Sequence, residues 1–222
     1  MKLVTSDVIN LFPSNVYKFH FEDYNKNELI KVVSNLKENL LSERRSNYGG
    51  WQSPSIFDLP LSKDQQDVML GLTEIIIQGI KHVEMLWNFD VISESLSPRI
   101  MSLWFNWNEK DNHNTLHHHG NTGYSGAFYI KKQEDGEDGS IEFEDTRRDA
   151  AYWEVPRLLM YQFMPMSPDQ FSNKKIMTKE GDLLIFPSYF NHRVTESNSE
   201  DFRLSASFNF NWFSNEKTNQ SK

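Results

Sequence analysis

The chain has 222 residues and no cysteine, which excludes disulfides, thiolate metal ligands and cysteine nucleophiles. Its formal net charge of −8 argues against a nucleic-acid or anionic-membrane partner, and its 14% aromatic content argues against a disordered chain. No apolar run reaches the ~20 residues of a membrane span, and the first residues lack the apolar stretch of a signal peptide. We therefore expect a cytoplasmic protein with a single domain over residues 1–222.

The first part of the chain, residues 1–96, is mainly helical by its hydrophobic periodicity. Residues 25–45 carry apolar side chains at spacings of three and four, which predicts an amphipathic helix. The sequence Ser62-Lys63-Asp64-Gln65 fits a capping box ahead of a second apolar run. We expect that run to form a helix of about 20–25 residues.

From residue 97 to 214 the pattern changes to short, β-prone segments separated by turn clusters. The predicted strands cover residues 100–107, 124–132, 140–143, 153–166, 176–178, 182–186, 190–196 and 202–213. Short strands at this spacing indicate a jelly roll or a barrel rather than βαβ units. The polar residues 215–222 are expected to form a frayed tail.

The last strand has two different faces. Apolar residues alternate with a polar set formed by Arg203, Ser205, Ser207, Asn209 and Asn211. The polar face could meet solvent, or it could line a pocket while the apolar face packs on the helices. The sequence leaves both interpretations open.

Three of the seven histidines are consecutive. In an extended segment His117 and His119 point to the same face, while His118 points to the other. Two imidazoles on one face can both reach one metal ion, so the pair is a candidate for a metal site. The alternative is a polar loop that is rich in histidine.

His192 strengthens the metal interpretation. It follows a Gly-Asp turn, a buried apolar strand and Pro187, and it begins the next strand. A lone histidine there would more often be a satisfied core residue. Together with the earlier pair, it matches the imidazole and carboxylate sites of non-haem iron oxygenases. We interpret His20 and His82 as structural and His113 as a solvated loop residue.

Arg203 is a candidate anion-binding residue. A hairpin with a turn near Ser199 would place Arg203 opposite Thr195, with its Cα roughly 10 Å from that of His192. This distance suits a small dicarboxylate that reaches a metal at one end and a guanidinium at the other. Ser205 would share that face. The alternative is an ion pair between Arg203 and a residue such as Glu196.

These motifs, taken in order, resemble the 2-oxoglutarate/Fe(II)-dependent oxygenases, and within that superfamily a bacterial and phage group. The resemblance covers most of the chain and rests on Phe12-Pro13, Gly50-Trp51-Gln52-Ser53, Trp104-Phe105-Asn106, His117-His118-His119, Ser125-Gly126-Ala127-Phe128-Tyr129, Asp145-Thr146-Arg147, Gly181-Asp182, Phe186-Pro187-Ser188 with His192, and Arg203 through Asn209. Any one motif is weak, but the ordered set is specific. The resemblance implies an α+β fold class: a double-stranded β-helix, jelly-roll or cupin-like, with the N-terminal helices packed on the major sheet.

The resemblance also implies an activity and a ligand set. The activity is that of a dioxygenase, which uses O2 and 2-oxoglutarate to hydroxylate a substrate and releases succinate and CO2. Fe(II) would be bound by His117 and His192, the catalytic pair, and the C5 carboxylate of 2-oxoglutarate by Arg203 with help from Ser205. Tyr129 and Asn106 would contact the cosubstrate or serve in packing.

The third iron ligand is open. Most of the superfamily has a carboxylate two residues after the first histidine, where this chain has His119. We expect His119 to be the ligand, with Asp145 in reserve.

Two other functions are compatible with the same residues. A cupin-type metalloenzyme would use the histidines without needing Arg203, and a jelly-roll binding module would keep the fold without catalysis. The substrate is expected to be a small molecule or a peptide, held partly by residues 147–153 and 164–173. The aromatic content would allow a homodimer without requiring one.

Overall fold

The computed structural model describes residues 14–86, 96–132, 139–145 and 173–215. Its elements are β1 (Tyr17–His20), α1 (Lys26–Asn39), β2 (Asn47–Tyr48), β3 (Trp51–Gln52), a short 3-10 helix η1 (Ile56–Asp58), α2 (Lys63–Leu86), β4 (Leu96–Asn108), β5 (His113–His117), β6 (Tyr124–Lys131), β7 (Ile141–Glu144), β8 (Asn173–Ile176), β9 (Asp182–Pro187), β10 (His192–Val194) and β11 (Arg203–Ser214). The predicted strand over residues 153–166, the expected substrate loops and all but the first residue of the expected tail lie outside the described residues.

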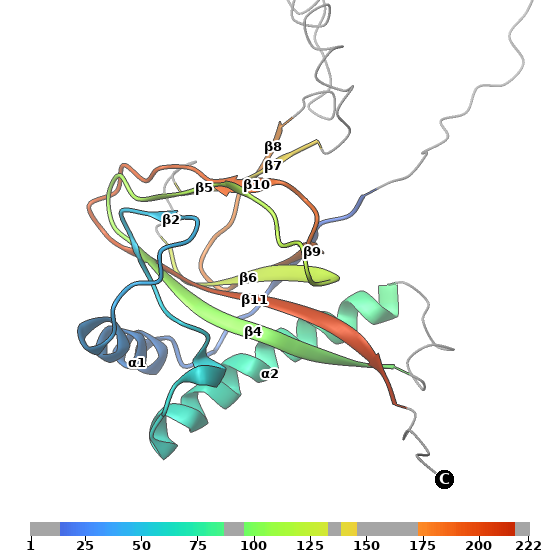
Figure 1. Ribbon diagram of the computed structural model, residues 1–222, viewed down its shortest axis with the longest axis horizontal. Helices are drawn as coiled ribbons and strands as arrows, with labels where there is room; N and C mark the ends of the chain where they lie inside the picture. Colours follow the sequence, from blue (N-terminus) through green and yellow to red (C-terminus); the bar gives the residue numbers. More distant parts are fainter. Residues whose placement is uncertain (1–13, 87–95, 133–138, 146–172, 216–222) are drawn as a thin grey trace, which may run out of the picture.

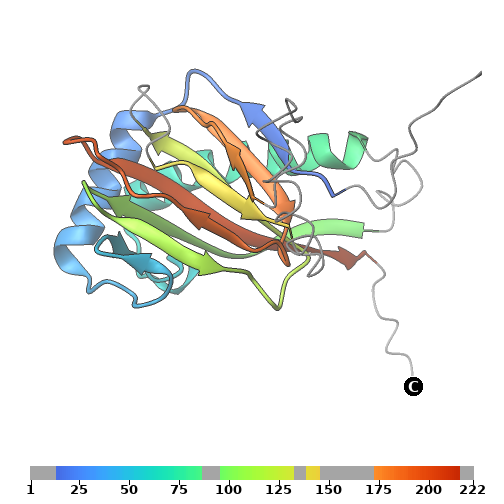
Figure 2. The same ribbon diagram turned by 90° about the horizontal axis from the view of Figure 1, so that it is seen from above.

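The strands form two antiparallel sheets that face each other (Figures 1 and 2). The larger sheet has the order β1-β9-β6-β11-β4-β3, and the smaller has the order β2-β5-β10-β7-β8. Strands that are consecutive in the chain repeatedly change sheet, as in a jelly roll. The predicted double-stranded β-helix is therefore confirmed.

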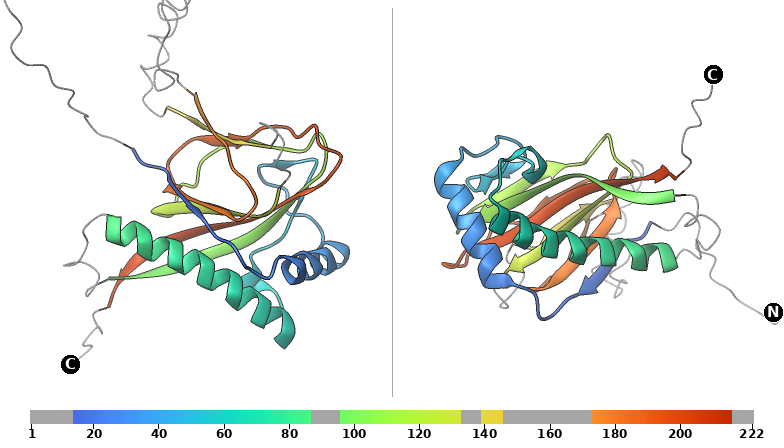
Figure 3. Two further views of the ribbon diagram at one scale, coloured as in Figure 1. Left: turned by 180° about the vertical axis from the view of Figure 1, so that it is seen from behind. Right: turned by 90° about the horizontal axis from the view of Figure 1, so that it is seen from below.

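Both helices cover the outer face of the larger sheet, as Figure 3 shows. α2 lies where the periodicity predicted, and the capping box forms at its start. α1 begins as predicted but ends at Asn39, so residues 40–45 of the predicted helix are not helical. The Ser62 backbone N–H donates to Gln65 Oε1 at 2.9 Å, and the Gln65 backbone N–H donates to Ser62 Oγ at 3.3 Å. None of the helices in the described part of the chain is long and apolar enough to span a membrane.

The main hydrophobic core lies between these helices and the larger sheet. It includes the buried side chains of β11, Leu204, Ala206, Phe208 and Phe210, together with Leu72, Ile76 and Ile80 of α2. Because alternate residues of a strand point to opposite faces, the polar residues of β11 face the smaller sheet. The choice left open by the sequence is thus resolved: the polar face of β11 is turned into the fold.

Three short strands of the first part were not predicted. β1 pairs with β9 at one edge of the larger sheet, and the two-residue strand β3 forms the other edge of that sheet. The two-residue strand β2 forms an edge of the smaller sheet. Hydrophobic periodicity cannot reveal a two-residue strand, because the period needs several residues to appear. β1 is held by a long-range contact, since His20 Nδ1 lies 2.9 Å from Oδ1 of the buried Asp182.

The predicted hairpin between the strands of His192 and Arg203 is wrong. β10 lies between β5 and β7 in the smaller sheet, whereas β11 lies between β6 and β4 in the larger one. The segment between them crosses from one sheet to the other, so the two residues face each other across the interior instead of along a ladder. His113 also departs from the prediction, because it begins strand β5.

Candidate active site

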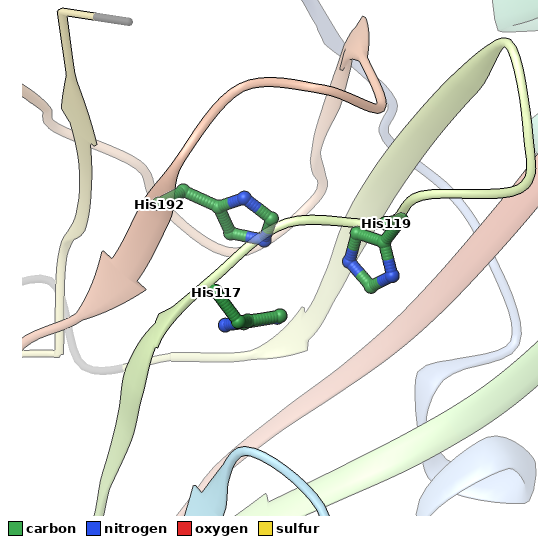
Figure 4. A group of neighbouring side chains, drawn as sticks. All are labelled: His117, His119 and His192. Carbon is green, nitrogen blue, oxygen red and sulfur yellow. The ribbon is translucent and has the colours of Figure 1, made fainter. Parts of the chain in front are cut away.

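The side chains of three histidines lie close together (Figure 4). His117 ends β5 and His192 begins β10, and the two residues are direct partners across this antiparallel pair. His119 lies in the loop after β5, where its backbone N–H donates to the Ser188 carbonyl at 2.8 Å. The potential ligand atoms of the three rings all lie within 4.8 Å of one another.

Two of the rings are oriented by backbone carbonyls. His117 Nδ1 lies 2.7 Å from the Thr115 carbonyl, and His192 Nδ1 lies 2.9 Å from the Phe190 carbonyl. A carbonyl can only accept, so Nδ1 carries the proton in both rings and Nε2 keeps its lone pair. Such outer contacts fix the tautomer and the direction of histidine ligands in metal sites.

All three imidazoles are held neutral. Burial lowers the pKa of His117, and it lowers the pKa of His119 to about 4 and that of His192 to about 3. The neighbouring imidazoles lower the last two pKa values further. At neutral pH the three rings therefore offer lone pairs, which is the form that binds a metal ion.

This donor set fits a divalent first-row metal. Imidazole nitrogen is a suitable ligand for iron, zinc, copper and nickel, so the three imidazoles are compatible with several first-row metal ions. In the described part of the chain, the group of ligand-type side chains contains His119 and does not include Asp145. Three imidazoles bring no negative charge, so a bound M²⁺ ion would keep its full charge for anionic ligands.

A cavity extends from the histidines into the fold and ends at Arg203. Its lining includes Asn106, Tyr129, Arg203 and Ser205 from the larger sheet, together with the apolar side chains of Ile141, Phe186 and Val194. Arg203 is 5% exposed, and its Nη1 donates to the Gly139 carbonyl at 2.9 Å. Its Nε is buried without a hydrogen bond, and no described acidic side chain forms an ion pair with it. The expected alternative, an ion pair with Glu196, is therefore not formed.

Burial lowers the pKa of the Arg203 guanidinium, because an unpaired charge is poorly solvated inside the protein. Burying such a charge is costly unless an anion accompanies it. The guanidinium retains free donors toward the cavity. The arrangement is a site for a carboxylate that enters from the histidine side.

Three further polar residues of the cavity stand in one row across the larger sheet. Asn106, Ser205 and Tyr129 are successive Cα partners on β4, β11 and β6. Burial raises the pKa of Tyr129, so its hydroxyl stays protonated and can donate. Asn106 donates to Ser207 Oγ at 3.0 Å, while its Oδ1 is buried without a partner. The three histidines, Arg203, Ser205, Tyr129 and Asn106 thus line one cavity, whereas the reserve candidate Asp145 is not among its lining residues.

Gly139 is a site residue that the sequence did not reveal. It has a φ of +61°, and a Cβ on it would lie 2.5 Å from Arg203 Nη1. Only glycine combines this backbone conformation with space for the guanidinium. Its position in a Gly-Glu-Asp-Gly turn was visible, but its contact with a residue more than sixty positions away was not.

Ser46 and Gln52 were also missed as site residues. Ser46 Oγ lies 3.4 Å from His117 Nε2, and both residues line a second cavity that adjoins the histidines. His20 and His82 lie outside the cluster and have partners of their own: His82 Nδ1 lies 2.8 Å from the Gln78 carbonyl in the same helix, and His20 contacts the distant Asp182.

The fold and the site together define a class: a double-stranded β-helix whose interior joins a neutral histidine cluster to a buried, unpaired guanidinium. Residues 102–209, the β-rich core, match the family described as "Putative 2OG-Fe(II) oxygenase". A comparison with curated proteins found no match. This β-rich core is similar to that of the 2-oxoglutarate/Fe(II)-dependent oxygenases.

Solved structures share the fold at low identity. HygX from Streptomyces hygroscopicus, with nickel and 2-oxoglutarate bound, is 16% identical with a TM-score of 0.54, over 89% of this chain and 82% of that chain. A prolyl-4-hydroxylase from Pseudomonas putida is 12% identical with a TM-score of 0.54, over 89% and 92%. A prolyl hydroxylase from Trichoplax adhaerens, in complex with a hypoxia inducible factor peptide fragment, is 10% identical with a TM-score of 0.58, over 88% and 82%.

Proposed function

We propose that this protein is a dioxygenase that binds Fe(II) at His117, His119 and His192 and uses 2-oxoglutarate and O2 to hydroxylate a substrate. The observation that carries the proposal is Arg203, a buried guanidinium that lines the same cavity as the histidines and forms no ion pair with any acidic side chain in the described part of the chain. A dicarboxylate that chelates a metal at one end meets this charge at the other. A cupin-type enzyme without such a cosubstrate would have no use for it.

The protein's own groups bind and orient the cosubstrate. Arg203 binds the C5 carboxylate, since a guanidinium forms paired, charge-assisted hydrogen bonds with it. The hydroxyls of Ser205 and Tyr129 line the cavity and can donate to the same carboxylate, and Asn106 lines the same cavity. His117 and His192 are presented through Nε2 by their carbonyl contacts, and His119 supplies the third nitrogen in place of a carboxylate.

Apolar side chains line the cavity beside the polar groups. Phe186 packs edge-on to His192 with ring centroids 4.9 Å apart. Ile141 and Val194 are partners in the smaller sheet and line the wall two residues beyond His192, toward Gly139. When bound, Fe(II) and 2-oxoglutarate together supply the oxidative chemistry, with succinate and CO2 as products. The protein contributes orientation, shielding and the substrate site.

Calorimetry under anaerobic conditions tests the proposal. The Fe(II)-loaded protein should bind 2-oxoglutarate more tightly than glutarate, which has both carboxylates but lacks the keto oxygen that completes the chelate. If glutarate bound as tightly as 2-oxoglutarate, the proposal would be contradicted, because the histidine end of the cavity would then contribute nothing to binding of the cosubstrate.

Other properties stay predictions. The substrate is proposed to be a small molecule or a peptide, and nucleic acid is disfavoured by the net charge of −8. A cytoplasmic location, a single domain, a homodimer and membership of the bacterial and phage group also remain untested.

A further inference from the structure

A second cavity of about 520 Å³ adjoins the histidine cluster on the side away from Arg203. It shares His117, His119, Ser46 and Trp104 with the first cavity. This volume is typical of a site for a small ligand or a short stretch of peptide. Because the cavity opens on the same histidines, a ligand in it would lie beside the metal site.

Gln52 lies in the wall of this cavity, and the residue is 4% exposed. Among the described residues none forms a hydrogen bond with its side-chain amide, whose atoms remain accessible from the cavity. The pairing of β3 with β4 explains why the Gln52 side chain points away from the helices. Gln52 is the direct partner of Asn106 across β3 and β4, and their neighbours Trp51 and Trp107 pack into the helix-side core. Gln52 therefore extends the row of Asn106, Ser205 and Tyr129 toward the second cavity.

Because no protein group occupies this amide, its hydrogen-bonding groups are free for a ligand in the cavity. The amide presents an acceptor oxygen and a donor NH2 group in one plane, which complements the N–H and C=O of another amide. Charged groups lie at the rim: Glu43 and Arg45 pair with each other at 3.6 Å, and Asp58 is exposed on η1. The exposed Phe57 and Met101 give the cavity an apolar border.

We propose that Gln52 is a specificity-determining residue that hydrogen-bonds an uncharged amide group of the substrate, such as a peptide or carboxamide group with an apolar neighbour. The proposal rests on the proposed function, because it places this amide beside the histidines. A free amino acid fits less well, since the buried wall at Gln52 has no charged group for its ammonium or carboxylate.

The test uses the full chain with Fe(II) and 2-oxoglutarate under anaerobic conditions. The probes are N-acetyl amino-acid N-methylamides and the matching methyl esters, in which oxygen replaces the amide N–H. A member of the amide series should shift the visible band of the chelated keto acid, and its ester should bind about tenfold more weakly. Gln52→Met should weaken amide binding about tenfold and remove the difference between amide and ester.

Two controls separate recognition from folding. Asp58→Asn, at the rim of the same cavity, should leave binding of the uncharged probes unchanged, whereas a loss of about tenfold there would overturn the assignment of amide recognition to Gln52. Thermal unfolding without any ligand should show Gln52→Met to be at least as stable as the native protein. A marked loss of stability would show that Gln52 has a structural role and would overturn the proposal.

The failures are distinguishable. A native protein that forms no band at all would refute the proposed function, and this inference with it. A normal band that no amide probe shifts at millimolar concentration would overturn only the assignment of Gln52. Unchanged probe binding by Gln52→Met would do the same.

Discussion

Replacing Arg203 by methionine should separate cosubstrate binding from stability. Truncating one partner of a buried, hydrogen-bonded charge pair typically costs about 2–5 kcal/mol of binding free energy. Arg203 is 5% exposed, so the larger half of that range applies, and Arg203→Met should raise the Kd for 2-oxoglutarate more than about a hundredfold. The Kd of Arg203→Lys for 2-oxoglutarate should lie between those of the native protein and Arg203→Met, because lysine keeps the positive charge but lacks the planar guanidinium.

The same change should cost little stability. Methionine removes one hydrogen bond, to the Gly139 carbonyl, worth about 1 kcal/mol, and it also removes an unpaired buried charge. Chemical denaturation should therefore give a free energy of unfolding within about 1 kcal/mol of the native value.

Arg193 provides the matched control for this experiment. It is an exposed arginine on β10 that pairs with Glu142 at 3.0 Å. In calorimetry, Arg193→Met should bind 2-oxoglutarate with the same Kd as the native protein. If Arg203→Met bound 2-oxoglutarate as tightly as the native protein, or unfolded several kcal/mol more easily, the reasoning from the unpaired guanidinium would be refuted.

The remaining predictions concern the third ligand, the glycine beside the guanidinium and the start of α2. His119→Leu should lose stoichiometric Fe(II), measured by metal analysis after anaerobic reconstitution, while His119→Asp should retain it because a carboxylate also suits iron; full iron in the leucine variant would remove His119 from the site. Gly139→Ala should weaken 2-oxoglutarate binding at least about tenfold, since its Cβ would displace the Arg203 fork; calorimetry with an unchanged Kd would contradict this. Ser62→Ala should lower the free energy of unfolding by about 1 kcal/mol through loss of the helix cap, without changing 2-oxoglutarate binding.

Local patterns in the sequence predicted the parts of the fold that depend on local physics. The periodicity over α2 and its capping residues give both the existence and the start of that helix, because helix formation and capping involve neighbours within four positions. The alternation along β11 likewise predicts a strand with two different faces. The spacing of His117 and His119 places two imidazoles on one side by the same argument.

Long-range pairing could not be predicted in this way. Nothing local distinguishes a hairpin between β10 and β11 from a crossover between two sheets, and the predicted hairpin was wrong for this reason. The contact of Gly139 with Arg203 and the register of Gln52 with Asn106 also join distant segments. They depend on the assembled sheets, and so they became visible only in the structure.

The central claim is that the histidine cluster and Arg203 form one site for Fe(II) and 2-oxoglutarate. Anaerobic addition of Fe(II) and then 2-oxoglutarate to the metal-free protein tests it most directly, with the visible charge-transfer band of a chelated keto acid as the readout. The account predicts a band in the native protein and none in His192→Ala. Iron that binds to the native protein without any band on addition of 2-oxoglutarate would contradict the account.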